Sequence, residues 1–324
     1  MTKIKNFHNK INKESIVLVC VVRDEELIID SFINHYKDLG ITHFIFIDNT
    51  SQDRTLELLL IRTDINSEIY SEHESYAENL YGVGWVNTLL NDYLKDVWCL
   101  VVDADEFLIL SEFQNLTLLR NSMIQEKANV VETCLVDFYP KTFNSKTYCS
   151  GSLPFEHSNY FHKFTPESIF LGCSCDNSRI IKGGLRHTIL NTNSKPTQSS
   201  VCLTKKSFFH NTFSNTHYLD VGMHWIMPKD FTDWSTYRNW KTANLEIRFF
   251  KKIQIICHFK YLRPNIKEWF QLRINRNQDW DNGTEYKKYI EYLNDSYYDE
   301  EYSIKYNGSC SLYTNTLNIL YDDY

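Results

Sequence analysis

The residues best suited to chemistry are two carboxylates one residue apart, Asp103 and Asp105, in the sequence Asp-Ala-Asp-Glu-Phe. Acidic doublets are common on solvated turns, but this one lies between two apolar runs, at residues 98–102 and 107–110. Because side chains alternate along an extended chain, the two carboxylates point in similar directions. Such a pair suits Mn²⁺ or Mg²⁺, which prefer oxygen ligands and keep open positions for a diphosphate. We therefore predict a metal site that neutralises charge on a departing diphosphate.

Three more polar clusters follow predicted strands in the first hundred residues. They are Arg23 with Glu25, the loop from Asp48 to Asp53, and His73 with Glu74. In open α/β sheets ligands bind beyond the carboxyl ends of the strands, so we expect these clusters to meet the acidic doublet at one edge. Each also has a structural interpretation: Asp48 and Asp53 could cap the helix that starts near residue 55. Arg23 could equally pair with a neighbouring carboxylate.

Two later segments are also candidates. His258 follows an apolar run and could be either a ligand or a hydrogen-bonded core residue. Gly183 and Gly184 lie between Lys182 and Arg186, where backbone amides and two cations could approach a diphosphate. The same glycine pair could instead form a turn between two strands.

The elements that must position these residues alternate between strand and helix. The β-branched run at 16–22 predicts a strand buried on both faces, and the helical spacing after it ends at Gly40, which can adopt a left-handed conformation. We predict further strands at 44–47, 68–70, 98–102, 129–137 and 253–257, and helices from near 55, at 77–94 and at 266–276. This alternation predicts an α/β fold with a mostly parallel sheet flanked by helices. No element is assigned between 139 and 201.

The composition is that of an ordinary folded protein, with 43% hydrophobic and 15% aromatic residues in a chain of 324. A formal net charge of -7 provides no basic stripe for a phosphate backbone, so we expect no nucleic-acid partner. The apolar run at 16–22 is too short for a signal peptide or a membrane span. We therefore expect no transmembrane segment and a cytoplasmic location, compatible with a peripheral position at the inner face of the membrane. The nine cysteines are expected to be reduced, and the oligomeric state is not predicted.

Several motifs, in their order along the chain, resemble those of the family 2-like glycosyltransferases. They are Val22-Arg23-Asp24-Glu25-Glu26, His35-Tyr36 before Leu39-Gly40-Ile41, Asp48-Asn49-Thr50-Ser51-Gln52-Asp53 and Asp103-Ala104-Asp105-Glu106-Phe107. Less specific similarity extends through residues 182–186, 203–206, 224–225 and 258–261. The resemblance covers about four fifths of the chain on motif order, and the tail after about residue 277 lies outside it.

The resemblance implies a GT-A fold, a Rossmann-like sheet flanked by helices, over residues 1–265. Residues from about 14 to 137 would then form the nucleotide-binding half, and residues 138–265 the acceptor half. Residues 266–324 would form a helical, tyrosine-rich C-terminal extension.

The resemblance also implies roles for single residues. Asp105 would hold the cation, Asp103 would face both ribose and metal, and His258 would supply a late ligand to the metal or the diphosphate. Asp48 would contact the base or the ribose. The other residues expected at the donor pocket are Val22, Arg23, Glu25, Asp53, Ala104, Lys182 and Arg186.

Inversion at the anomeric carbon is a further implication, and it needs a general base for the acceptor hydroxyl. Here the sequence departs from the commonest family pattern, because no Glu-Asp pair follows the metal motif. The base is therefore unassigned, with Asp176, Asp220, His224, Asp230 and Asp233 as candidates, of which we carry forward His224, Asp220 and Asp233. His224 is attractive because the ordinary pKa of histidine lies near neutrality and Trp225 could stack on a sugar face.

These observations predict a metal-dependent glycosyltransferase of the hexosyltransferase type. It would move a sugar from a nucleotide-sugar donor, a UDP-sugar in the first instance, to a glycan or lipid-linked glycan acceptor in surface polysaccharide synthesis. One alternative is a nucleotidyltransferase, although the chain lacks the Gly-rich basic loop that such enzymes place after the first strand. Another is a non-catalytic nucleotide- or glycan-binding module, which would explain the missing Glu-Asp pair.

Overall fold

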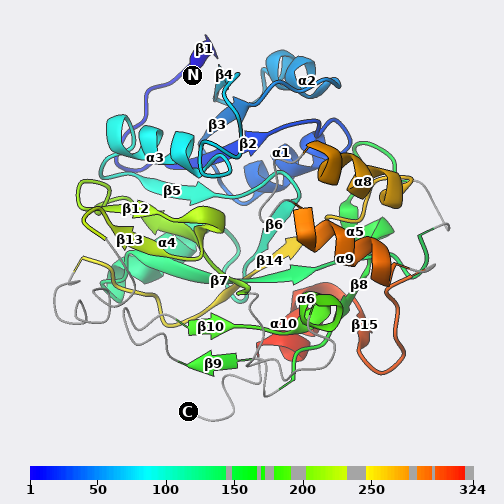
Figure 1. Cartoon of the computed structure of the whole chain (residues 1–324). Helices are drawn as coiled ribbons and strands as arrows, with labels where there is room; N and C mark the ends of the chain where they lie inside the picture. Colours follow the sequence, from blue (N-terminus) through cyan, green and yellow to red (C-terminus); the bar gives the residue numbers. More distant parts are fainter. Residues whose placement is uncertain are drawn as a thin grey trace.

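A central sheet of nine strands forms the body of the molecule (Figure 1). The computed structural model describes residues 1–143, 148–165, 169–171, 179–190, 202–231, 246–276, 283–293 and 296–317. The strands, in spatial order, are β1 (Thr2–Lys5), β4 (Ser67–Ser71), β3 (His43–Asp48), β2 (Ile16–Val22), β5 (Trp98–Val101), β11 (Thr204–His210), β7 (Val130–Asp137), β14 (Gln254–His258) and β6 (Glu106–Ile109). Six of them share one direction and only β1, β11 and β6 oppose it, which confirms the predicted α/β fold with a mostly parallel sheet.

Strand β2 shows why a continuous apolar run predicts a strand that is buried on both faces. Its even-numbered residues, from Ile16 to Val22, pack into one core cluster together with α1 (Ile29–Asp38). Val17 and Val19 face the opposite side and pack with α3 (Val83–Asp92). Helices therefore cover both faces of the sheet here, and every position of the strand needs an apolar side chain.

The N-terminal elements follow the predicted order, with α2 (Thr55–Ile61) between β3 and β4. The helix predicted at 77–94 is shorter than expected, and its predicted start was wrong. Leu80, Tyr81 and Gly82 have φ angles of 51°, 55° and 80°, a left-handed stretch that no right-handed helix can include. The helix α3 consequently begins only at Val83.

In the described part of the region left unassigned from the sequence, the elements are short. They are α5 (Pro154–His157), β8 (Tyr160–His162), β9 (Ile169–Leu171), β10 (Arg179–Ile181) and α6 (Gly184–Leu190). The glycine pair at 183–184 has φ angles of 121° and 59° and forms a turn from a strand into a helix, rather than a turn between two strands. After β11 come β12 (His217–Leu219), the 3-10 turn η3 (Val221–Met223) and β13 (Ile226–Pro228).

The C-terminal part packs tightly on the body. It contains α8 (Ile266–Arg276), whose bounds match the prediction, then α9 (Thr284–Tyr292), β15 (Ser303–Lys305) and α10 (Gly308–Thr316). Leu312 and Leu317 are fully buried in the main core cluster, and Tyr289 of α9 is fully buried against Tyr261 and Phe270. This packing holds α8 and α9 in place beside the sheet (Figure 1). Among the described residues, no helix combines the length and the apolar character needed to cross a membrane.

Candidate functional site

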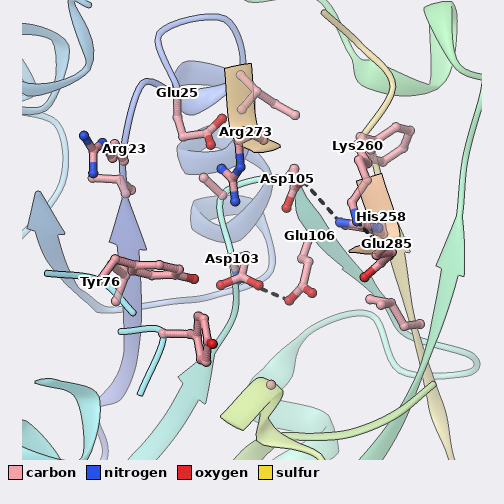
Figure 2. Close-up of a pocket in the computed structure, with 18 of the residues that line it drawn as sticks. Arg23, Glu25, Tyr76, Asp103, Asp105, Glu106, His258, Lys260, Arg273 and Glu285 are labelled. Carbon is pink, nitrogen blue, oxygen red and sulfur yellow. Dashed lines mark hydrogen bonds and ion pairs between the residues drawn. The ribbon is translucent and has the colours of Figure 1, made fainter. Parts of the chain in front are cut away.

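A cavity of about 330 Å³ lies at the carboxyl ends of β2 and β5, between the sheet and the helices α8 and α9. Figure 2 shows polar side chains from several separate segments that face this space. Nine of the residues predicted from the sequence line it: Val22, Arg23, Glu25, Asp103, Ala104, Asp105, Arg186, His224 and His258. The fold therefore brings most of the predicted residues to one edge of the sheet.

Five other predicted residues are not among those that line the cavity. Asp48, Asp53, Lys182 and Asp220 are described but lie outside its lining, and Asp233 lies outside the described residues. Asp220 precedes the 3-10 turn that forms part of the wall, and its backbone amide donates to the carbonyl of Trp225 at 3.0 Å. Burial raises the pKa of the Asp220 carboxyl.

Asp53 and Asp48 have structural roles in the loop after β3. Asp53 accepts hydrogen bonds from the backbone amides of Glu26, at 3.0 Å, and Thr55, at 2.9 Å. Asp53 therefore satisfies the amide of the first residue of α2, although the N-cap residue itself is Arg54, whose side chain makes no capping hydrogen bond. Asp48 accepts a hydrogen bond from the Ser51 amide through one oxygen, while its other oxygen is buried with no hydrogen-bond partner in the part of the chain that the structure describes.

Asp105 and His258 form the centre of the site. The His258 Nε2 lies 3.2 Å from the Asp105 Oδ2, and the His258 Nδ1 lies 2.5 Å from the Asp137 Oδ1. The sheet register explains this meeting, because His258 on β14 is paired with Asp137 on β7 and with Glu106 on β6. Arg186 closes the group, with its Nε 2.8 Å from the second oxygen of Asp137.

The pKa values in this group follow from burial and charge. Burial alone would lower the pKa of His258, but Asp105 and Asp137 outweigh it and raise the pKa to about 9. Burial would likewise raise the pKa of Asp105 and of Asp137. The positive charge of His258, with Arg186 beside Asp137, instead holds both carboxyl pKa values well below their usual range. Both carboxylates are therefore ionised.

The donor set around Asp105 fits a divalent cation. As a cation, His258 donates from Nδ1 to Asp137 and from Nε2 toward Asp105. A bound metal would displace the Nε2 proton while Asp137 kept the Nδ1–H, which is the carboxylate-histidine arrangement typical of metal ligands. Asp103 lines the same cavity, and its side chain is 55% exposed. Among the described residues, no three His, Cys, Asp or Glu side chains form a complete metal site. A cation here would therefore take part of its coordination from outside the protein, as Mg²⁺ and Mn²⁺ commonly do from substrate phosphates.

Lys205 fixes the loop that carries the acidic doublet, and the sequence analysis did not single it out. Its Nζ lies 2.5 Å from the Glu106 Oε1 and 3.6 Å from the Asp103 Oδ2, deep beside the cavity. Burial would lower the pKa of Lys205, but these two carboxylates raise it, so the side chain stays cationic. The other oxygen of Glu106 accepts a hydrogen bond from the Asp103 amide at 3.1 Å, which sets the turn between β5 and β6.

His224 is held against β11 by two hydrogen bonds. Its Nδ1 lies 2.7 Å from the Thr204 carbonyl oxygen, and Lys206 donates to the His224 carbonyl at 2.6 Å. Because a carbonyl only accepts, the proton is on Nδ1 and the Nε2 keeps its lone pair. Burial, with the positive charges of Lys205 and Lys206, lowers the pKa of His224 to about 4. The imidazole is therefore neutral at neutral pH, with its Nε2 unprotonated.

The end of the cavity near β2 and β3 is aromatic and polar. Tyr76 and Tyr81 both line it, with ring centroids 6.0 Å apart in an edge-to-face arrangement. The Nη1 of Arg23 lies 3.4 Å from the Oδ1 of Asn49. Burial raises the pKa of the Glu25 carboxyl, and the nearby positive charge of Arg263 opposes that rise. Aromatic faces beside such donors and acceptors can hold a planar base.

The opposite wall comes from the C-terminal helices, which the sequence analysis left out of the site. The lining residues supplied by this part of the chain are Lys260, Arg263, Trp269, Arg273, Arg276, Glu285 and Tyr286. The sequence contained a pattern that could have identified three of them. Trp269, Arg273 and Arg276 are spaced four and three residues apart, so they share one face of a helix. In Figure 2, Arg273 lies between Glu25 and the acidic doublet, and Glu285 lies beside His258 and Lys260.

Comparisons with known proteins add little to this geometry. No protein-family model matches the chain, and no curated protein matches it either. Solved structures to which it is similar include HddC from Yersinia pseudotuberculosis, at 8% identity and a TM-score of 0.38 over 79% of this chain and 96% of that chain. Others are glucosyl-3-phosphoglycerate synthase from Mycobacterium tuberculosis with Mn²⁺, uridine diphosphate and either glucosyl-3-phosphoglycerate or phosphoglyceric acid.

The likeness to that synthase is partial. The two structures are 19% and 18% identical to this chain, with TM-scores of 0.24 and 0.25, over 39% of this chain. The matched part spans only 44% and 43% of the synthase chain. At TM-scores below 0.5, none of these likenesses carries an argument about activity. The case for a function therefore rests on the site itself.

Proposed function

We propose that this protein is a metal-dependent glycosyltransferase that uses a nucleotide-sugar donor. The observation that carries the proposal is the meeting of Asp105 and His258 at 3.2 Å, with the imidazole oriented by Asp137, inside a cavity that also has an aromatic end. Bound between these two side chains, a divalent cation would neutralise the charge that develops on a departing diphosphate. The family resemblance of the Asp-Ala-Asp-Glu-Phe motif points to the same chemistry.

In this proposal the protein's own residues bind and orient the donor. Tyr76 and Tyr81 border the base, and Asp103 lies where it can reach both the ribose and the cation. Lys205 keeps the acidic doublet in one conformation through its contacts with Glu106 and Asp103. A preorganised site of this kind gains rate because its charges need no rearrangement during reaction.

We assign the general base to His224. Its Nε2 is unprotonated at neutral pH and its ring lines the same cavity as the acidic doublet. The base takes the proton of the acceptor hydroxyl as that oxygen attacks the anomeric carbon, which inverts the configuration. Asp220 is half-buried and lies outside the lining, so its role would be to hold the turn rather than to touch substrate.

The finer assignments rest on the family resemblance. We propose UDP as the donor nucleotide, Mn²⁺ or Mg²⁺ as the cation, a glycan or lipid-linked glycan as the acceptor, and surface polysaccharide synthesis as the process. Residues 14–137 would bind the nucleotide and residues 138–265 the acceptor. The C-terminal residues 266–324 would add α8 and α9 to the wall of the same cavity.

The test is a thermal-shift panel of nucleoside diphosphates and nucleotide sugars, each with Mn²⁺ or EDTA. A ligand at a hundred times its dissociation constant stabilises the native state by about 2.7 kcal/mol. We expect stabilisation by one nucleotide family, only with the cation, together with release of the nucleoside diphosphate from its sugar. Pyrophosphate release from a nucleoside triphosphate would replace the proposal by a nucleotidyltransferase, and binding without any turnover would replace it by a binding module.

A further inference from the structure

Four arginines gather at one end of the cavity. They are Arg23, which follows β2, Arg263, which precedes α8, and Arg273 and Arg276 of α8 itself, and we call them the arginine cluster. All four line the cavity, and none belongs to the group around Asp105 and His258. Three come from a part of the chain remote in sequence from the donor motifs.

The indole ring of Trp269 packs against three members of the arginine cluster. The guanidinium carbon of Arg263 lies 3.9 Å from the indole centroid, that of Arg276 lies 5.6 Å away, and that of Arg273 lies 6.0 Å away. Arg273 also lies 5.4 Å from the ring centroid of Tyr286. Stacking on aromatic faces restricts a guanidinium and leaves its N–H groups at the edge for other partners. The side chains are therefore held in place before any ligand binds.

Ion pairs fasten the cluster to the loop after β2. Arg276 lies 2.9 Å from a carboxylate oxygen of Asp24, Arg263 lies 3.3 Å from one of Glu25, and Arg263 also contacts the Asp24 carbonyl. Burial and the nearby charges of Arg276 and Arg273 lower the pKa of Arg23, as expected where like charges crowd together. An anion placed among these guanidiniums would relieve that repulsion.

We infer that the arginine cluster is a phosphate-binding subsite, separate from the residues that would hold the cation. Arginine presents parallel N–H groups that match two oxygens of a phosphate. Four positive charges, which Asp24 and Glu25 balance only in part, suit a diphosphate better than a single carboxylate. This inference rests on the proposed function for the source of the phosphate. The source is either the donor diphosphate or a phosphate carried by the acceptor, and both have the same chemistry.

The experiment is a calorimetric titration of the whole chain with inorganic pyrophosphate, and separately with UDP, in EDTA so that no divalent cation takes part. The key variant is Arg273→Ala, because this side chain lies between Glu25 and the acidic doublet (Figure 2). The matched control is Lys267→Ala, which removes an exposed positive charge from the same helix without changing the cavity lining. Arg273→Met, which keeps packing on Trp269, replaces the alanine variant if that one does not fold.

We expect the wild type and Lys267→Ala to bind pyrophosphate equally, and Arg273→Ala to bind it about tenfold more weakly or worse. Arg273→Lys should recover only part of the loss, because an ammonium cannot bind two oxygens in the same plane. If saturating UDP abolishes pyrophosphate binding, the subsite serves the donor diphosphate. If pyrophosphate still binds beside UDP, it serves a phosphate of the acceptor.

The inference is overturned if the wild type does not bind pyrophosphate. It is also overturned if a folded Arg273→Ala variant binds pyrophosphate as tightly as the wild type. The proposed function is tested separately, by release of nucleoside diphosphate from nucleotide sugars with Mn²⁺. Arg273-dependent pyrophosphate binding without any such release would refute the transferase and leave the phosphate subsite standing. Release of nucleoside diphosphate without Arg273-dependent pyrophosphate binding would support the transferase and refute the phosphate subsite.

Discussion

The imidazole of His258 and the carboxylate of Asp105 meet at 3.2 Å although these residues are 153 positions apart in the sequence. They meet because β14 inserts between β7 and β6, which places His258 beside the turn that carries the acidic doublet. If these two residues are metal ligands, as we propose, the turn and the strand that carry them form the site only in the folded protein. Metal binding should therefore stabilise the native state.

The first prediction concerns Asp105→Asn. The amide is similar in shape but has no charge for a cation, so we expect the Mn²⁺-dependent stabilisation by UDP to disappear in a thermal-shift measurement. The control is Asp96→Asn, since the Asp96 side chain is 82% exposed and does not line the cavity. An Asp105→Asn variant that keeps the full Mn²⁺-dependent shift would remove Asp105 from the metal site.

The first half of the chain could be read well from the sequence because its signals are local. The apolar run of β2 and the glycine after α1 act within a few residues, and both elements occur where they were expected. The acidic doublet, Arg23 and Glu25 were predicted together for a similar reason, since parallel strands bring their carboxyl ends to one edge. The start of α3 was missed because three left-handed residues precede it, and no composition rule shows that Leu80 and Tyr81 adopt this conformation.

The remaining part of the site depends on long-range packing. Lys205 lies near the start of β11, and a lysine is rarely expected to be buried. Its partner Glu106 is on β6, which β7 and β14 separate from β11 in the sheet. Arg273 enters the cavity only because α8 is anchored by contacts such as that of Phe270 with Tyr289. Single-sequence periodicity shows which residues share a helix face, but it cannot show which surface that face meets.

The second prediction is that substituting Asp137 lowers the unfolding free energy more than substituting Arg186. Asp137 contacts both Arg186 and His258. Asp137→Asn leaves Arg186 without this carboxylate and His258 with Asp105 alone, and should cost about 3 kcal/mol of unfolding free energy. Arg186→Gln leaves Asp137 with His258 and should cost clearly less. Urea denaturation of both single variants and the double variant measures the difference and the coupling between them.

The double variant should be more stable than additivity predicts, because each substitution removes the partner that the other leaves unpaired. Arg54→Gln serves as the control, since Arg54 forms an exposed ion pair with Glu57 that contributes little to stability. Equal losses for the two single variants, or strict additivity, would show that the buried pair is not coupled as its geometry implies.

The third prediction tests whether the position of the His224 imidazole matters for activity, by substituting its neighbour Gly222. Gly222 has a φ of +67°, and a Cβ added there would lie 2.8 Å from the His224 Nε2. We expect Gly222→Ala to displace the imidazole and to lower the rate of nucleoside diphosphate release about a hundredfold, as a misplaced catalytic group does. Initial rates at saturating donor measure the effect.

Gly151→Ala is the matched control for this prediction. Gly151 has a φ of +84° and nothing within 4 Å of an added Cβ, so this variant carries the same backbone strain of about 1 kcal/mol without the contact. His224→Gln should lower the rate at least as much as Gly222→Ala, because it removes the base itself. If Gly151→Ala and Gly222→Ala lose activity equally, strain and not His224 accounts for the effect.

The last prediction concerns acid stability and His35. The His35 Nε2 lies 2.9 Å from the Leu108 carbonyl oxygen, and burial lowers the pKa of this imidazole from 6.5 to about 4. In the unfolded chain the group binds a proton below pH 6.5, whereas in the native state it resists protonation until about pH 4. Its contribution to stability is therefore complete above pH 6.5 and is lost as the pH falls toward 4.

We expect the unfolding free energy of the wild type to fall between pH 6.5 and 4. About 2 kcal/mol of this fall should come from His35, a value reduced because the side chain is partly exposed to solvent. His35→Gln can still donate to Leu108 but cannot titrate, so its stability should fall less between pH 6.5 and 4. His8→Gln, at an exposed histidine, should follow the wild type. Urea denaturation at several pH values between 7 and 4 gives the comparison. Parallel curves for the wild type and His35→Gln would mean that His35 takes up its proton as easily in the native state as in the unfolded chain.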